Sequence, residues 1–374
     1  HLNPALAVAA ALAARGHEIA WAAHASQLGA RLPEGARIYS LDGAVFDLAA
    51  DAGAVRGLES VRVFFEDYAI PLAQSALAPL EAAVAAFRPD ALVVDHQMLA
   101  GALVARQSGL PWATLVTTSA SILKMSPAFD DWVEEQYRGV QRGYLAESAR
   151  TARPDFSPYV NIVFTVEALL GDAHPRVPAP YVFVGPARGQ GRRAVDFPWE
   201  WLARDGKKLL VSLGTVSRDR DTRFFEVMME ALAGMDAQAV LVAPPALRTA
   251  APANVLVRDY VPQLDLLARM DAVVCHAGHN TVCEALSFGL PLGVAPIRDD
   301  QPVIARQVID AGAGVFIRHG KVTPAAARTA LATLLGDAAL AANARRLGVE
   351  LAAASGAEGA ADAVEALSRV TAAA

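Results

Sequence analysis

Short, continuous apolar runs alternate with helical patterns along most of the chain. In the first half these runs occupy residues 17–24, 88–96, 110–118, 160–166 and 181–187. In the second half they occupy residues 207–215, 239–244, 254–262, 272–278 and 290–296. Apolar runs without alternating polar positions are typical of parallel strands that helices cover on both faces. The pattern therefore predicts an α/β fold with Rossmann-like, doubly wound parallel sheets.

The chain opens with a helical pattern. Asn3 is a favourable N-cap residue, Pro4 suits the first helical position, and Gly16 can end the helix in a left-handed conformation. Because strands and helices alternate in such folds, a helix at the start implies a strand before it. We therefore expect His1 to lie at the tip of a strand that precedes this sequence.

A polar segment that contains Gly and Pro separates the two halves of the chain. We predict a first Rossmann-like domain over residues 1–186, a linker over 187–206 and a second Rossmann-like domain over 207–355. Residues 356–374 are predicted to form a C-terminal helix that packs back on the first domain. The expected architecture is two doubly wound domains that face a cleft.

Composition and charge narrow the class of protein. The 374 residues suit about two domains, and 54% hydrophobic residues suffice for two cores. Because 33 basic residues face 39 acidic ones without long single-sign blocks, nucleic acid and anionic membranes are not expected partners. No apolar run approaches the roughly 20 residues of a membrane span. We expect a soluble, cytoplasmic protein whose oligomeric state the sequence leaves open, a homodimer included.

The segment HAGHNT, residues 276–281, lies between a predicted strand and a predicted helix. Parallel sheets bind ligands at the carboxyl ends of their strands, and the free N–H groups of a following helix favour an anion. Asn280 or Thr281 is expected to cap this helix, Gly278 allows close approach of the backbone, and His276 adds a donor that can be cationic. This combination predicts a phosphate site without a Walker lysine.

Further polar residues extend this site. Glu284 falls one turn into the helix, where its carboxylate could accept two hydrogen bonds from a ribose diol. Asp300 and Gln301 follow the next predicted strand and offer acceptors and a donor for sugar hydroxyls. Phosphate, ribose and sugar ligands in one place predict a nucleotide sugar.

At these residues the sequence resembles the family 1 nucleotide-sugar glycosyltransferases, the inverting enzymes of the GT-B fold, in their bacterial natural-product branch. HAGHNTVCEALSFGLPLGVAPIRDDQ is similar to the family's His-x-Gly-x-x-(Ser/Thr)-x-x-Glu donor signature with its later acidic-Gln pair. RDYVPQLDLL resembles the aromatic-x-Pro-Gln element, and KKLLVSLGT resembles the Ser-x-Gly-(Ser/Thr) strand end. The opening HLNPALAVAAALAARGHE is similar to the start of the family after its first strand, so the resemblance spans nearly the whole chain.

The resemblance implies a role for each matching residue. The first domain would bind the acceptor and the second the donor. The implied donor-site residues are Tyr260 against the base, Val261 and Gln263 at the base edge or ribose, Gly214, Thr215, His276, Gly278, Asn280 and Thr281 around the diphosphate, Glu284 at the ribose, and Asp300 with Gln301 at the transferred sugar. Because the plant branch carries Trp at the position of Tyr260, the resemblance does not decide between UDP and TDP sugars.

His1 and Asp95 are the implied catalytic pair. An imidazole, with an unperturbed pKa of about 6.5, suits the removal of a proton from an acceptor hydroxyl. Asp95 ends a predicted strand, where its carboxylate could orient the ring and stabilise the imidazolium. The acceptor oxygen would then displace the nucleoside diphosphate with inversion, and no cofactor or divalent metal would be required.

Two metal sites were considered as alternatives. The Asp-x-Asp segment from Asp219 to Asp221 could bind manganese, but capping of the helix over 222–232 is favoured. Cys275, His276, His279 and Cys283 could bind zinc, but they lack the usual Cys-x-x-Cys spacing. We therefore predict no metal ligands.

An aromatic group in the first half is open to two interpretations. Its members are Phe64, Phe65, Tyr68, Met98, Phe129 and Trp132. They are either core residues or the pocket of an apolar acceptor of polyketide, macrolide, flavonoid or terpenoid type. Two alternatives to sugar transfer also remain, namely a nucleotide-sugar epimerase of the same fold and a non-catalytic nucleotide-sugar-binding partner protein.

Overall fold

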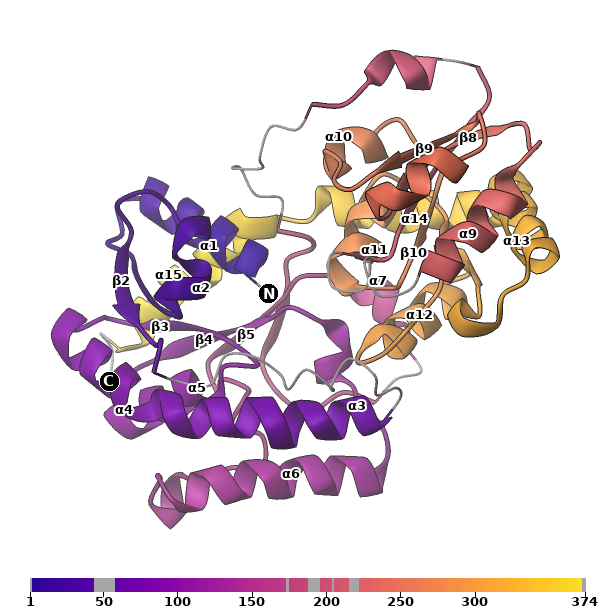
Figure 1. Cartoon of the computed structure of the whole chain (residues 1–374). Coiled ribbons are helices and arrows are strands. Elements are labelled where there is room, and N and C mark those ends of the chain that lie inside the picture. Colours follow the sequence, from indigo (N-terminus) through magenta and orange to yellow (C-terminus); the bar gives the residue numbers. More distant parts are fainter. Residues whose placement is uncertain are drawn as a thin grey trace. The chain divides into compact units, whose positions relative to one another are not determined.

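The computed structural model describes residues 2–43, 58–172, 175–187, 196–203, 205–214 and 222–371. The chain divides into two compact units (Figure 1). The first unit comprises His1–Phe164, Ala173–Gln190 and Ser355–Ala374, and the second comprises Thr165–Asp172 and Gly191–Ala354. Thus Thr165–Asp172, within the range predicted for the first domain, joins the second unit, and the C-terminal residues join the first.

The first unit contains two parallel sheets. One has the order β3-β4-β5-β6, and the other pairs β1 with β2. The strands are β1 (Ala20–Ala23), β2 (Arg37–Ser40), β3 (Leu92–Asp95), β4 (Trp112–Val116), β5 (Val160–Val163) and β6 (Tyr181–Phe183). The helices are α1 (Leu2–Ala14), α2 (Ala25–Leu28), α3 (Leu58–Val63), η3 (Phe64–Ala69), α4 (Ile70–Phe87), α5 (Leu99–Ser108), α6 (Pro127–Arg142) and α15 (Gly356–Thr371). Because α1 begins at Leu2, Asn3 lies within the helix, and the prediction that Asn3 caps it is wrong.

The C-terminal helix α15 lies beside α1 (Figure 1). Its residues Ala360, Ala361 and Leu367 are buried in one core with residues of α1, β4 and β5. Arg15 pairs with Glu358 at 2.6 Å and with Asp362 at 2.7 Å on the rim of this contact. Since exposed ion pairs contribute little, the apolar burial is the main reason that α15 stays on this unit.

The second unit is built on one parallel sheet of order β12-β11-β10-β7-β8-β9. Its strands are β7 (Lys207–Ser212), β8 (Ala237–Val242), β9 (Val255–Arg258), β10 (Ala272–Cys275), β11 (Leu292–Val294) and β12 (Gly314–Phe316). Its helices are α7 (Glu167–Leu170), α9 (Thr222–Leu232), α10 (Gln263–Leu267), α11 (His279–Ser287), α12 (Gln301–Asp310), α13 (Pro324–Gly336) and α14 (Ala338–Ala353). The strand order reverses between β7 and β10, and such a switch point is where open α/β sheets bind ligands.

The sheet of the second unit is buried as its apolar runs predict. Phe224, Phe225 and Met228 of α9 are fully buried and pack with Leu209 and Leu241 of the sheet. α13 lies beside α9, and α11 packs with α12 and α14 (Figure 1). The predicted α/β class with helix-covered parallel sheets is therefore confirmed.

Close packing of α14 fixes the position of α11. A Cβ atom added at Gly348 would lie 2.6 Å from the carbonyl oxygen of Leu286, so only glycine allows the two helices to approach this closely. α11 begins at the switch point. Its direction, and thus the direction of its N-terminal N–H groups, is set by this contact.

One continuous helical segment, Glu59–Phe87, is long and apolar enough to cross a membrane by length and composition. The pair formed by α13 and α14, bent by 61°, passes the same test as a broken span. Leu72, Ala76 and Leu80 of the first segment are buried in a core with Ala100 and Val104 of α5. The segment therefore acts as a packing helix of the first unit.

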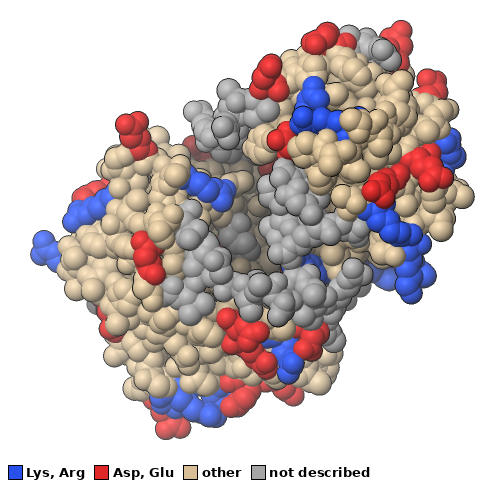
Figure 2. All heavy atoms as spheres, viewed as in Figure 1, with Lys and Arg blue, Asp and Glu red and all other residues tan. Residues whose placement is uncertain are grey.

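Acidic and basic side chains are interspersed on the face drawn in Figure 2. No extended area of one sign is visible there among the residues that are coloured. This distribution agrees with the net charge of −6 spread along the sequence. An electrostatic surface for nucleic acid is not apparent on this face.

Candidate functional site

The candidate donor site lies at the switch point of the second unit. β7 and β10 are neighbours there, with Ser212 opposite Cys275. Beyond these strand ends the backbone adopts positive φ angles at Gly214 (74°) and at Ala277 (62°). A non-glycine residue in this region is strained, typically by about 1–3 kcal/mol, and such strain is concentrated at functional sites. The strain at Ala277 lies in the turn that starts α11.

The imidazole of His276 is held between two glycines. A Cβ atom at Gly278 would lie 2.5 Å from Nε2 of His276, and one at Gly214 would lie 2.7 Å from Cε1. Any side chain at either position would therefore displace the ring. Nδ1 of His276 is buried and has no hydrogen-bond partner among the residues that the structure describes. Gly278 thus allows a close approach, as predicted, and the group that approaches its backbone here is the ring of His276.

The pKa of His276 is lowered to about 4, mainly by burial and to a smaller extent by the positive charge of Arg298, against an opposing hydrogen bond with the backbone of Ser212. The imidazole is therefore neutral at pH 7. The sequence predicts a donor that can be cationic, and burial of the ring is the physical reason that it is not. A neutral imidazole still offers a hydrogen bond to a phosphate oxygen, but it brings no charge.

The stability of the protein should fall as the pH falls from about 6.5 towards 4. The pKa of His276 drops from 6.5 to about 4 on folding, so the unfolded chain binds this proton first. The contribution of neutral His276 to the free energy of unfolding is fully present above pH 6.5 and is lost between pH 6.5 and about 4. It amounts to at most about 3 kcal/mol. Urea unfolding at several pH values should show a smaller acid loss for His276→Gln than for wild type. Replacement of the exposed His17 by Gln is the control. If His276→Gln loses as much stability in acid as the wild type does, the assignment of a neutral His276 is wrong.

The helix α11 begins at His279, and Gly278 is its N-cap. Asn280 and Thr281 therefore lie in the first turn, and the prediction that one of them caps the helix is wrong. Gly278 offers no side chain for capping, so the N–H groups of the first turn stay available to an anion. The side chains of Asn280 and Thr281 are half-buried at the same end of the helix.

The predicted ribose residues lie close together. The side-chain amide of Gln263, at the start of α10, donates to the Glu284 carboxylate at 2.6 Å. Tyr260 precedes α10, and 51% of its surface is exposed, so its ring has a free area for stacking on a base. Val261 is buried. The structure thus brings residues of two predicted motifs, separated by 21 positions, into direct contact.

Gln301 makes a contact within the protein, and its role at the transferred sugar stays a prediction. Its side-chain oxygen accepts the backbone N–H groups of Ile297 at 2.9 Å and Arg298 at 3.1 Å. The oxygen therefore holds the loop between β11 and α12. Asp300 is the N-cap of α12, and Asp299 before it has a φ of 55°. Neither the contact of Gln301 nor the proximity of Arg298 to His276 is evident in the sequence.

Several predicted residues lie outside the described residues. These are His1, Thr215, Asp219 and Asp221. The catalytic role of His1, the phosphate role of Thr215 and both roles considered for the Asp-x-Asp segment remain predictions.

The cysteines of the second unit are protonated packing residues. Burial raises the pKa of both Cys275 and Cys283 to about 12. The thiol of Cys283 donates to Thr165 Oγ1 at 3.4 Å and lies 3.7 Å from Nε2 of His279. The zinc alternative remains untested by these contacts. The contact with Thr165 also attaches the segment Thr165–Asp172 to α11.

In the first unit, Asp95 ends β3 and its carboxylate is held by neighbours. Oδ1 accepts the backbone N–H of Gln97 at 2.9 Å, and the Thr117 hydroxyl donates to Oδ2 at 3.5 Å. Nδ1 of the buried His96 lies 3.8 Å from Oδ1 of Asp95. Asp95 was predictable from the sequence, but Thr117, which directly follows the neighbouring strand β4, was not. Only the parallel pairing of β3 with β4 brings the two together.

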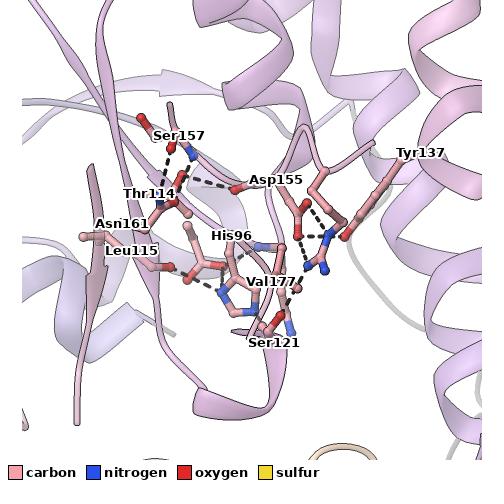
Figure 3. Close-up of polar contacts among 12 residues, drawn as sticks. His96, Thr114, Leu115, Ser121, Tyr137, Asp155, Ser157, Asn161 and Val177 are labelled. Carbon is pink, nitrogen blue, oxygen red and sulfur yellow. Dashed lines mark hydrogen bonds and ion pairs between the residues drawn. The ribbon is translucent and has the colours of Figure 1, made fainter. Parts of the chain in front are cut away.

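His96 is fixed at both ring nitrogens (Figure 3). Nδ1 lies 3.3 Å from the carbonyl oxygen of Leu115, and Nε2 lies 2.8 Å from the hydroxyl of Ser121. Because a carbonyl oxygen only accepts, we assign the proton to Nδ1, and Ser121 donates to Nε2. His96 therefore has a structural role beside Asp95.

A buried ion pair supports the same region (Figure 3). Arg153 donates to both carboxylate oxygens of Asp155, at 2.9 Å and 2.7 Å, and also to the carbonyl oxygen of Ser121 at 3.3 Å. The hydroxyl of Tyr137 donates to Asp155 at 3.2 Å. Burial raises the pKa of Tyr137 well above its usual value. These contacts connect α6 and the segment before β5 to the residues that follow β4.

The six aromatic and Met side chains considered as an acceptor pocket are all half-buried. The ring of Phe65 lies 5.7 Å from Phe64, 5.4 Å from Trp132 and 5.6 Å from Tyr137. Phe65, Phe129 and Trp132 pack against one core, and Tyr68 and Met98 pack against another. They are thus packing residues that keep accessible surface, and their role toward an acceptor stays a prediction.

A separate pocket lies at the amino end of β7. Its volume is about 320 Å³, and it is lined by Trp199, Leu202, Lys208 and Arg269. The guanidinium of Arg269 lies 4.6 Å from the centre of the Trp199 ring. Lys208 is the second residue of β7, so this pocket is at the opposite edge of the sheet from the switch point.

A family model agrees with the site. The model described as erythromycin biosynthesis protein CIII-like, C-terminal domain, matches residues 226–367. These residues include β10, α11, β11 and α12, which carry most of the candidate donor site.

Similar proteins with assigned names point in the same direction. The chain is 29% identical to an uncharacterized UDP-glucosyltransferase, YojK, of Bacillus subtilis, over 74% of this chain and 72% of that protein. It is 28% identical to the oleandomycin glycosyltransferase of Streptomyces antibioticus, over 98% of this chain and 88% of that protein.

Solved structures are similar over almost the whole chain. The glycotransferase of kitacinnamycin has a TM-score of 0.76 at 26% identity, over 98% of this chain and 96% of that one. The calicheamicin glycosyltransferase CalG4 has a TM-score of 0.76 at 24% identity, over 99% of this chain and 95% of that one. The similarity to CalG4 concerns the fold.

Proposed function

The chain belongs to the family 1 glycosyltransferases of the GT-B fold, and we propose that it transfers a sugar from a UDP- or TDP-sugar to a hydroxyl of a hydrophobic small molecule. It is related to enzymes that glycosylate macrolides and other antibiotics. The observation that carries this proposal is the switch-point site. There a neutral His276 lies between Gly214 and Gly278, directly before the open N-terminus of α11. Donors aimed at a charge that grows during the reaction are typical of catalytic sites.

The donor is proposed to bind with its diphosphate at the start of α11. The first-turn N–H groups, the side chains of Asn280 and Thr281, and His276 would donate to phosphate oxygens. Glu284, held by Gln263 at 2.6 Å, would accept from the ribose hydroxyls, and Tyr260 would stack on the base. The order of these residues from α10 to α11 supports a nucleotide laid across the carboxyl ends of the strands.

The chemical step is proposed to use His1 as the base and Asp95 as its partner. The acceptor hydroxyl gives its proton to the imidazole while its oxygen bonds to the anomeric carbon. The bond from that carbon to the diphosphate oxygen breaks on the opposite face, and the electron pair stays on the diphosphate, so the configuration inverts. The carboxylate of Asp95, already held by Gln97 and Thr117, would stabilise the imidazolium.

The reaction is proposed to need no metal. The growing charge on the diphosphate is met in this proposal by protein donors and the dipole of α11. Transfer rates that are unchanged by a chelator would support this part of the proposal, and rates that depend on added manganese would contradict it.

Gly278→Ala tests the donor site. The added Cβ would lie 2.5 Å from Nε2 of His276 and would displace the ring and block the approach of a phosphate. We expect kcat/KM for the nucleotide sugar to fall about 100-fold, comparable to the loss of one preorganised donor. Transfer is measured with a panel of UDP- and TDP-sugars and hydrophobic acceptors.

Gly336→Ala is the matched control for this assay. Gly336 ends α13 in the same unit, and no atom lies within 4 Å of an added Cβ, so its activity should equal that of the wild type. Equal activity of Gly278→Ala and Gly336→Ala would contradict the donor site. Release of an epimerised sugar without any acceptor would replace the proposed transfer by epimerisation.

A further inference from the structure

A neutral His276 brings no positive charge to a leaving diphosphate. The oxygen that leaves the anomeric carbon gains charge as its bond breaks, and the dipole of a helix N-terminus offers only about half an elementary charge. A formal positive charge inside a largely dry site would be worth more than the same charge in water.

Among the described residues, Arg298 is a cation whose charge acts on His276. It follows β11, whose Val294 pairs with Cys275, the residue before His276. The backbone N–H of Ala295 also donates to the carbonyl oxygen of Cys275 at 2.8 Å. The segments that carry Arg298 and His276 therefore leave the sheet at the same edge. The guanidinium of Arg298 is near enough that its charge helps to lower the pKa of His276.

The guanidinium is also largely buried and little used by the protein. The side chain of Arg298 is 13% exposed, and Nε lies 3.5 Å from Oδ2 of Asp299. This single ion pair is the one contact of its guanidinium among the described residues. A guanidinium carries five N–H donors, which is more than this one ion pair uses.

The loop around Arg298 is held in place. Gln301 accepts the backbone N–H groups of both Ile297 and Arg298, and Asp299 adopts the left-handed region with a φ of 55°. This backbone is strained and then fixed by a buried side chain, as is usual for residues that position a functional group. The contact of Gln301 thus acts on the position of Arg298.

We propose that Arg298 binds the phosphate next to the transferred sugar, as the cation of the donor site. The inference rests on the proposed function of the same site. Glu284 and Gln263 mark the ribose end of the site, whereas Arg298 lies on the β11 side, next to Asp300 and Gln301. A diphosphate that runs between these ends has its sugar-bearing phosphate at Arg298. When the anomeric C–O bond breaks, the electron pair that stays on this phosphate is stabilised by the guanidinium, which can pair with two phosphate oxygens.

The test is calorimetric binding of three ligands, namely the nucleoside, its monophosphate and its diphosphate, to the full chain. In Arg298→Gln, affinity for UDP or TDP should fall about 10- to 100-fold, the usual range for losing a charged hydrogen bond. Affinity for UMP or TMP should change less than about twofold, because the second phosphate is the group that Arg298 contacts. Arg298→Lys should keep part of the diphosphate affinity, since it retains the charge but loses the paired geometry.

Arg306→Gln is the matched control. Arg306 lies on α12 in the same segment, is exposed, and pairs with Asp310 at 2.7 Å. Its affinities for all three ligands should equal those of the wild type. Unchanged affinity of monophosphate in Arg298→Gln also reports that this variant is folded.

The outcomes separate the two claims. If the wild type prefers the diphosphate to the monophosphate and Arg298→Gln keeps that preference, the assignment of Arg298 is wrong and the donor site stands. An equal loss for monophosphate and diphosphate assigns Arg298 a purely structural role and also overturns the inference. If the wild type itself shows no preference for the diphosphate, both the inference and the proposed donor site fail.

Discussion

Asp95→Asn should lower kcat/KM for sugar transfer about 1,000-fold or more, while the affinity for the nucleotide donor stays unchanged. The amide can still accept the N–H of Gln97, now at 2.9 Å from Oδ1, so the local geometry should survive. It cannot stabilise an imidazolium, and loss of the carboxylate in a comparable His-Asp pair costs about four orders of magnitude. Steady-state kinetics together with donor titration separate the two effects.

Thr117→Val provides the control for this result. It removes the hydroxyl that lies 3.5 Å from Oδ2 but leaves the carboxylate, and we expect a loss of less than about tenfold. Equal activity of Asp95→Asn and wild type would remove Asp95 from the mechanism. An equal loss in both variants would instead mean that the hydrogen bonds, and not the charge of Asp95, matter.

Asp155→Ala should destabilise the protein by about 3–5 kcal/mol, because it leaves the charge of Arg153 buried without a partner. The Asp155 side chain is 1% exposed and that of Arg153 is 20% exposed. The variant also removes the acceptor of the Tyr137 hydroxyl, which lies 3.2 Å away. Urea unfolding at pH 7 measures the change in the free energy of unfolding.

Two further variants distinguish a buried charge from a general packing effect. Glu135→Ala breaks exposed pairs with Arg138 and Arg142 and should cost less than about 1 kcal/mol. Replacing both members of the buried pair by apolar residues, Arg153→Met with Asp155→Leu, should recover much of the lost stability. A loss in Asp155→Ala no larger than that in Glu135→Ala would contradict the role of the pair.

The sheets were predictable because their signal is local. Runs such as LLVS and AVVC contain apolar residues on both faces of the strand, and in the structure these residues of β7 and β10 are buried. The ends of helices were also predictable from the sequence where a single residue determines them. Gly16, for example, follows the end of α1 at Ala14 and has a φ of 89°. Such features depend on neighbours within a few positions.

The cap of α11 shows where local reasoning is insufficient. Asn280 and Thr281 are both favourable N-cap residues, so the sequence predicts that the helix starts at one of them. The structure uses Gly278, where the ring of His276 leaves no room for a Cβ atom. A contact in three dimensions therefore decides between residues with similar propensities.

The charge of the donor site depended on burial in the same way. The sequence shows an imidazole beside a phosphate site, but the neutral state of His276 follows from its enclosure at the switch point. Arg298 was not identified, because nothing in IRDDQ distinguishes its guanidinium from one on the surface. The pair of Arg153 with Asp155 was missed for the same reason. The roles of these residues are evident only when the strands are aligned in the sheet.

A structure of the protein with bound UDP or TDP tests the central claim most directly. The account predicts that the diphosphate lies at the carboxyl ends of β7 and β10, within hydrogen-bonding distance of His276 and the first-turn N–H groups of α11. A nucleotide bound instead at the amino end of β7, in the pocket lined by Trp199, Lys208 and Arg269, would contradict it.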